Sequence, residues 1–127
     1  MKPLLAILLA IHLCALPAKA DGIALAGSEW GFGDGDKRFI QFGFDGRVSG
    51  HAGCNRFTGG YSEDGDRFLF GLLAMTQMMC APADMERERA FSQLLNKTRH
   101  FEATHMKLTF YSGAGNALIT LQRRDFD

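Results

Sequence analysis

The side chains with the most reactive chemistry in this sequence are thiols, thioethers and one imidazole in its central part: Cys54, Cys80, Met75, Met78, Met79 and His51. These are the ligand types that Cu(I) prefers, so a redox or soft-metal site centred on Cys54 and Cys80 is one hypothesis. Methionines at alternating positions more often fill gaps in a core. Reactive cysteine pairs are usually closely spaced, as in Cys-x-x-Cys. We therefore favour a structural disulfide between Cys54 and Cys80, with two buried thiols as the other possibility, and predict no metal ligand.

Residues 1–20 have the pattern of a secretory signal peptide. Lys2 supplies a positive charge, residues 4–16 form an apolar run, and Ala18 and Ala20 form a small-x-small cleavage site. The apolar run is too short to span a membrane. We expect cleavage after Ala20 and a protein that resides in the periplasm or is secreted.

The cysteine count fits that compartment. A lipoprotein signal would need a small residue before the modified cysteine, whereas Leu13 precedes Cys14. Cys14 leaves with the signal peptide, so a mature domain of residues 21–127 would keep Cys54 and Cys80 as an even pair in an oxidising compartment. A disulfide that closes this loop would contribute about 3 kcal/mol to stability.

Composition limits the classes of partner. The chain has 127 residues, 46% of them hydrophobic, and 14 basic residues balance 14 acidic ones. Without Lys2 and Lys19, 12 basic residues face 14 acidic ones, a formal charge of −2. Because nucleic acids select strongly basic surfaces, we expect no nucleic-acid binding. The sequence shows no linker or repeat, so one domain is predicted.

Short aromatic and β-branched runs separated by Gly, Asp and Asn predict a mainly β protein. Residues 38–44 place Phe39 on one side and Ile40, Phe42 and Phe44 on the other, before a tight turn at residues 45–46. The expected strands are residues 38–44, 47–51, 57–62, 67–70, 75–78, 100–104, 107–111 and 117–123.

One segment, residues 83–97, has helical spacing. Its apolar positions recur at intervals of three and four residues, and its polar positions cluster early: Phe91, Leu94, Leu95 and Thr98 against Glu86, Arg87, Glu88 and Arg89. Asp84 is the expected N-cap. The fold class is therefore α+β: a highly curved antiparallel sheet or small barrel of about seven to eight short strands. The helix is inserted before the last three strands and covers one opening.

Several short motifs together resemble the META/HslJ-like domain family. They are the early Trp30, the segment Phe44-Asp45-Gly46-Arg47-Val48-Ser49-Gly50, and the family-motif residues Gly53, Cys54, Asn55, Phe57, Gly60, Tyr61, Thr76 and Cys80. The resemblance covers essentially all of residues 21–127. It implies a small β-rich domain of bacterial envelope proteins, linked in some members to heat shock, antibiotic tolerance or secretion, and it brings no catalytic residues.

These observations predict a non-enzymatic binding module with a role in stress response or envelope maintenance. No catalytic residue and no cofactor are predicted, and the partner would be another envelope protein or a hydrophobic ligand. The many aromatic residues leave two interpretations of the interior, an apolar cavity or a filled core, and the short chain favours the filled core. Redox or copper handling at Cys54 and Cys80 is the alternative function.

Overall fold

The computed structural model describes residues 23–125, so the expected signal peptide and its cleavage site after Ala20 lie outside the described residues. Within that range, one helix interrupts a series of strands, and their order along the chain is β1 (Glu29–Gly31), β2 (Phe39–Phe42), β3 (Arg47–His51), β4 (Arg56–Asp64), β5 (Arg67–Phe70), β6 (Ala74–Met75), α1 (Pro82–Lys97), β7 (Thr98–Ala103), β8 (Lys107–Ser112) and β9 (Ala117–Arg123).

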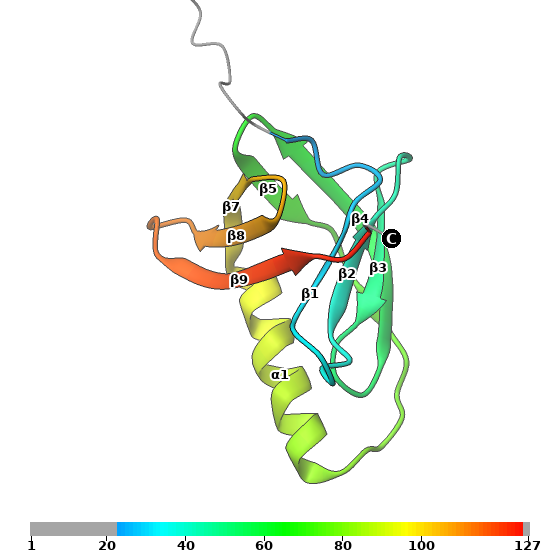
Figure 1. Cartoon of the computed structure of the whole chain (residues 1–127). Helices are drawn as coiled ribbons and strands as arrows, with labels where there is room; N and C mark the ends of the chain where they lie inside the picture. Colours follow the sequence, from blue (N-terminus) through cyan, green and yellow to red (C-terminus); the bar gives the residue numbers. More distant parts are fainter. Residues whose placement is uncertain (1–22, 126–127) are drawn as a thin grey trace, which may run out of the picture.

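The strands form a closed antiparallel barrel (Figure 1). The spatial order β3-β2-β1-β9-β8-β7-β5-β4 returns to its start because β3 also pairs with β4. The two-residue strand β6 pairs with β4 beside the eight barrel strands, where Phe57 lies opposite Met75 and Thr58 opposite Ala74. The predicted α+β class, a small barrel with one helix before the last three strands, is confirmed.

The barrel interior is filled with side chains. Phe68 lies at the centre of an aromatic cluster, with its ring centroid 4.6 Å from that of Phe70 and 5.2 Å from that of Phe110. Trp30 is fully buried, and its indole N–H donates a hydrogen bond to the Ser28 hydroxyl. Edge-to-face and tilted ring pairs of this kind add to the free energy gained from burial alone. The packing agrees with a filled core.

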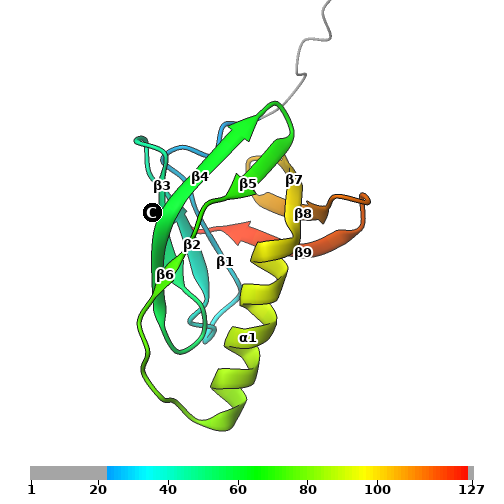
Figure 2. The ribbon, with the colours of Figure 1, turned by 180° about the vertical axis from the view of Figure 1, so that it is seen from behind.

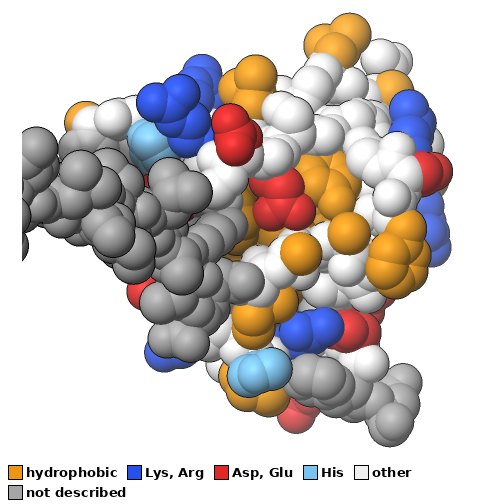
Figure 3. All heavy atoms as spheres, turned by 90° about the horizontal axis from the view of Figure 1, so that it is seen from above, with side chains coloured by type: hydrophobic (Ala, Val, Ile, Leu, Met, Phe, Trp, Pro, Cys, Tyr) orange, Lys and Arg blue, Asp and Glu red, His pale blue; other side chains and the backbone are white. Residues whose placement is uncertain are grey.

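The two ends of the barrel are closed differently. At the lower end in Figure 2, α1 covers the opening and buries Phe91 and Leu95. At the opposite end, the segment before β1 crosses the barrel, buries Leu25, and donates a hydrogen bond from the Gly27 N–H to the Phe42 carbonyl. Viewed onto that end, hydrophobic side chains gather near the centre beside acidic ones, with basic side chains toward the rim (Figure 3).

Three details differ from the sequence predictions. The strand expected over residues 38–44 ends at Phe42, and the bond from the Gly43 N–H to the Arg47 carbonyl closes the turn, which leaves Phe44 inside it. Phe44 is therefore 88% exposed instead of facing the core. The strand expected over residues 75–78 is only Ala74–Met75, and β1 was not predicted as a strand.

The helix start also differs. Asp84 is not the N-cap: α1 begins at Pro82 with Ala81 as its N-cap, and Asp84 lies in the first turn. Proline is favoured at the first helical position because its missing N–H would have no partner there, so the helix begins before the expected cap. Between Ile23 and Asp125, no helix is both long enough and apolar enough to cross a membrane.

Candidate functional site

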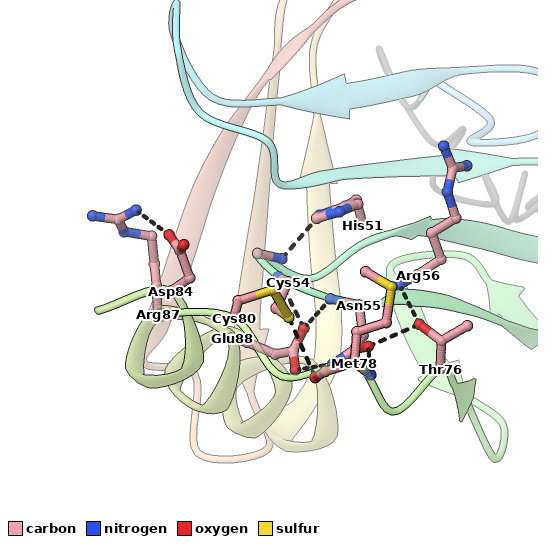
Figure 4. Close-up of a disulfide and its surroundings, with 11 residues drawn as sticks. His51, Cys54, Asn55, Arg56, Thr76, Met78, Cys80, Asp84, Arg87 and Glu88 are labelled. Atoms are coloured by element: carbon pink, nitrogen blue, oxygen red, sulfur yellow. Dashed lines mark hydrogen bonds and ion pairs between the residues drawn. A yellow bond between two sulfur atoms is a disulfide. The ribbon is translucent and has the colours of Figure 1, made fainter. Parts of the chain in front are cut away.

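The cysteine motif lies where β3 connects to β4, directly against α1 (Figure 4). Cys54 and Cys80 form a disulfide with an S–S distance of 2.03 Å and a Cα–Cα distance of 5.8 Å, so the predicted pairing is confirmed. The bond joins the β3–β4 connection to the segment that enters α1. Neither sulfur is a thiolate in this state, and neither is available as a metal ligand.

Asn55 is the centre of the hydrogen bonding around this disulfide. Its side-chain oxygen accepts from the Thr76 hydroxyl at 2.9 Å and from the Met78 N–H at 2.6 Å. Its amide nitrogen donates to the Met78 carbonyl at 3.2 Å and to Glu88 Oε2 at 2.8 Å. These four bonds use the two donors and two acceptor positions of the amide. Asn55 therefore joins the β3–β4 connection, the segment after β6, and α1.

Glu88 is the helix residue that completes the network. It is only 6% exposed, and its Oε1 accepts from the Asn55 N–H at 2.6 Å and from the Cys54 N–H at 3.1 Å. With the bond to its Oε2, the carboxylate receives three hydrogen bonds from a connection whose amides would otherwise be buried without partners. We refer to Cys54, Cys80, Asn55, Thr76 and Glu88 as the latch.

The latch also sets the charge state of Glu88. Burial alone would raise the pKa of its carboxyl, because burial disfavours the charged form. The hydrogen bonds from Asn55 and Cys54, together with nearby His51, outweigh burial and lower the pKa below its usual value of 4.5. The carboxyl is therefore ionised at neutral pH, where an ionised acceptor makes the strongest hydrogen bonds.

Gly53 allows the connection to pack closely on α1. Its φ of +130° is a conformation that residues with a Cβ rarely adopt. A Cβ there would also lie 3.3 Å from the Glu88 nitrogen and 3.4 Å from the Asp84 carbonyl oxygen, both backbone atoms of the helix. The Gly53 N–H donates to His51 Nδ1 at 3.1 Å. Glycine at this position therefore lets Glu88 reach the motif amides.

The other family-motif residues lie farther along β4. Phe57 is buried in the barrel. The Gly60 carbonyl accepts from the Gly71 N–H at 2.8 Å, where the chain leaves β5. The Tyr61 hydroxyl donates to the Gly43 carbonyl at 3.1 Å, and its ring stacks on Phe68. The motif thus has two parts, the latch with Gly53 and a set of residues that shape β4 and the core.

Sequence reasoning missed Glu88, which it assigned to the polar side of the helix. A signal was present: Glu88 precedes Phe91 by three residues and Leu95 by seven, a spacing that places all three on one helix face. The neighbouring Glu86, by contrast, is exposed and pairs with Arg89. A carboxylate on the apolar face of a helix needs buried donors, and the Cys-Asn motif supplies them.

The chemistry of the latch is that of a structural clamp. Its carboxylate, amide and hydroxyl are engaged with one another and with backbone groups, and its thiols are oxidised. Within residues 23–125, no group of three or more His, Cys, Asp or Glu side chains is placed to hold a metal ion.

A groove lies on the outer face of the strands that the latch holds. It has a volume of about 470 Å³ and crosses β2, β3, β4 and β6. Its floor and walls include the outward-facing residues Phe39, Gln41, Ser49, Arg56, Thr58 and Thr76. Thr76 belongs to both features, since its hydroxyl accepts from the Arg56 N–H at 3.1 Å and donates to Asn55. The latch therefore fixes one wall of this outer groove.

Solved structures of other proteins have a similar architecture. The solved structures that are similar include an NMR structure of a protein from Burkholderia xenovorans, with a TM-score of 0.67, 21% identity, and coverage of 80% of this chain and 85% of that one. A second protein solved by NMR has a TM-score of 0.59, 26% identity, and coverage of 79% and 90%. A DUF4847 family protein from Bacteroides vulgatus has a TM-score of 0.57, 16% identity, and coverage of 72% and 62%.

No curated protein matches the sequence. The family model of the META domain matches residues 23–125, which include every residue of the latch and every strand of the barrel. This chain belongs to the META domain family.

Proposed function

We propose that this protein is a non-enzymatic binding module of the bacterial envelope that recognises another protein through its outer groove. The observation that carries the proposal is the contrast between a filled barrel and an open groove on its outer face. Large side chains such as Trp30, Phe42 and Phe110 occupy the interior with 0 to 1% exposure. The groove, of about 470 Å³, is open on the outer face of β2, β3, β4 and β6.

The filled core favours a protein partner over a hydrophobic ligand. A lipid-binding barrel keeps an apolar cavity in its interior, whereas here the rings of Phe68, Phe70 and Phe110 pack on one another. The groove combines apolar surface from Phe39, Phe57, Ala74 and Met75 with hydroxyl, amide and guanidinium groups. This mixture suits a peptide segment, which has a polar main chain and side chains of both kinds.

The disulfide and the family support an extracytoplasmic setting. Disulfides persist in oxidising compartments, and the predicted signal peptide would deliver the chain to the periplasm. A role in stress response or envelope maintenance rests on the resemblance to envelope proteins of this family. The absence of catalysis is part of the proposal, and the full engagement of the latch groups in structural hydrogen bonds supports it.

The proposal is tested by crosslinking in the cell. A photo-crosslinking amino acid replaces Thr58, in the groove, or Thr120, on the outer face of the opposite strands, where Thr120 lies across from Thr109. We expect one defined adduct with a single envelope protein from position 58 and none from position 120. Identical adducts from both positions, or no adduct from position 58, would contradict a binding role for the groove.

The alternative of redox or copper handling at Cys54 and Cys80 makes a different prediction. It requires free thiols in the exported protein, whereas the structure has them joined. Thiol labelling of the protein as it leaves the cell separates the two functions, because a structural disulfide remains unlabelled until the chain is unfolded and reduced.

A further inference from the structure

The outer groove has a distinct charge pattern. Arg56 is exposed, and within residues 23–125 its side chain makes no hydrogen bond or ion pair. Its labelled side chain in Figure 4 extends away from the disulfide. Arg47 is also exposed and donates one hydrogen bond, from Nη2 to the Thr58 hydroxyl at 3.3 Å. Two guanidinium groups with unused donors therefore lie on this face.

Among residues 23–125, the lining of the groove has one basic side chain, that of Arg56, and Arg47 reaches the groove through its bond to Thr58. None of the described residues that line the groove is Asp or Glu. At its borders, Asp45 accepts from the backbone N–H of Arg47, and Glu29 is paired with Arg124 at 3.7 Å. The described lining lacks acidic groups although residues 21–127 carry more acidic than basic residues. This part of the groove thus carries a positive side chain and no negative one, on a protein with no overall positive charge.

We propose that the outer groove binds an extended acidic segment of a partner protein, with Arg56 and Arg47 pairing with its carboxylates. This inference rests on the proposed binding function and specifies the partner's chemistry. Guanidinium groups form paired hydrogen bonds with carboxylates, and those bonds are charge-assisted. The Phe39 ring and the methyl groups of Thr58 and Thr76 would contact the apolar parts of the segment.

The spacing of the charges specifies an extended ligand. The Arg47 guanidinium lies beside Thr58, because it donates a hydrogen bond to the Thr58 hydroxyl. Thr58 is two positions from Arg56 along β4. Two residues of a strand span roughly 7 Å, and an extended peptide repeats its same-face side chains at this distance. Acidic residues at alternating positions of the partner therefore match the two arginines. A single small dicarboxylate would leave most of the open groove unfilled.

The test uses the disulfide-bonded protein and a capped peptide of alternating threonine and aspartate. Amide chemical shifts recorded by NMR during a titration locate the peptide and give its affinity. We expect shifts at Ser49, Thr58 and Thr76, with few on β8 and β9, and weaker binding as salt is added. The same peptide with asparagine in place of aspartate should not bind.

Variants assign the binding to the arginines. Arg56→Ala should weaken binding roughly three- to tenfold, and Arg56→Lys should weaken it less, because lysine keeps the charge but not the planar fork. Arg67→Ala is the matched control, since Arg67 is exposed on β5 outside the outer groove, and it should leave the affinity unchanged. Equal affinities for the parent protein and Arg56→Ala, or shifts confined to β8 and β9, would overturn the proposal.

Two outcomes separate the possible failures. If free succinate binds the groove as tightly as the peptide, the site takes small anions and the peptide proposal is wrong. If neither binds, the acidic-segment proposal is wrong. Crosslinking from Thr58 to one envelope protein would then still support the broader binding function, whereas its failure would remove both.

Discussion

Replacing Glu88 with glutamine tests whether the latch holds α1 on the barrel. Glutamine keeps the size of the side chain but has one acceptor oxygen and one amide group. Its oxygen can still accept from the Cys54 and Asn55 N–H groups, but its amide would face the Asn55 Nδ2, which now donates to Glu88 Oε2 at 2.8 Å. Asn55 cannot rotate to offer its oxygen, because Thr76 and Met78 donate to that oxygen.

The expected loss of stability in Glu88→Gln follows from the hydrogen bonds that change. Hydrogen bonds to a charged group contribute about 1.5–3 kcal/mol each, and neutral ones about 0.5–1.5 kcal/mol. Glu88→Gln loses one such bond, places two donors against each other, and weakens two more bonds. We expect the free energy of unfolding to fall by roughly 2–4 kcal/mol, a large share of the roughly 5–15 kcal/mol that domains possess.

The assay is urea unfolding of the oxidised protein, followed by circular dichroism, with the midpoint and slope fitted separately. Glu86→Gln is the matched control in the same helix, because Glu86 pairs with Arg89 on the exposed surface. That variant should cost at most about 0.5 kcal/mol. Equal effects of the two variants would refute the argument that Glu88 supports the motif through buried hydrogen bonds.

The lowered pKa of Glu88 gives the same experiment a pH dependence. A carboxyl whose pKa is lower in the folded state stabilises the fold above its unfolded pKa, near 4.5. That stabilisation is lost as the pH falls through the folded-state value. The difference in stability between the parent protein and Glu88→Gln should therefore be constant above about pH 5 and shrink in more acidic buffer. A difference that grows on acidification would contradict the assigned charge state.

Three further variants test other parts of the latch. Cys54→Ser opens a loop of 26 residues and should lower the free energy of unfolding by about 3 kcal/mol, so an unchanged melting midpoint in oxidising buffer would contradict a structural disulfide. Asn55→Asp places a second carboxylate within 2.8 Å of Glu88 and should cost more than about 2 kcal/mol at pH 7 by urea unfolding, with partial recovery near pH 4. Gly53→Ala should cost roughly 2–4 kcal/mol because of both φ and contact with the helix, whereas Gly35→Ala, with φ +83° and no atom within 4 Å of its Cβ, should cost less in calorimetry.

The parts of the fold that were predicted depend on local patterns. Alternation along residues such as Ile40 and Phe42, and glycine in the turns between strands, determine hairpins without reference to the rest of the chain. The disulfide was predicted from the count of cysteines that remain after export. Each of these signals lies within a few residues of sequence or requires only the number of cysteines.

The wrong predictions concern positions where distant or competing contacts determine the structure. Phe44 continues the alternation of β2, but it lies in the turn that the bond between Gly43 and Arg47 closes. Asp84 has the chemistry of an N-cap, yet Pro82 fits the first helical position and the helix starts there. The role of Glu88 depends on donors that are 33 and 34 residues away, and periodicity alone could not identify them.

If the barrel core and the cysteines are structural, binding is left to the outer groove. The most direct measurement is a pair of native and denaturing mass spectra of the protein exported to its own compartment and purified without reductant. We expect a chain that begins at Asp21, is two hydrogens lighter than its reduced mass, and carries no metal or lipid. Free thiols with a bound metal, or a lipid retained in the native spectrum, would instead place the function at the cysteines or in the interior.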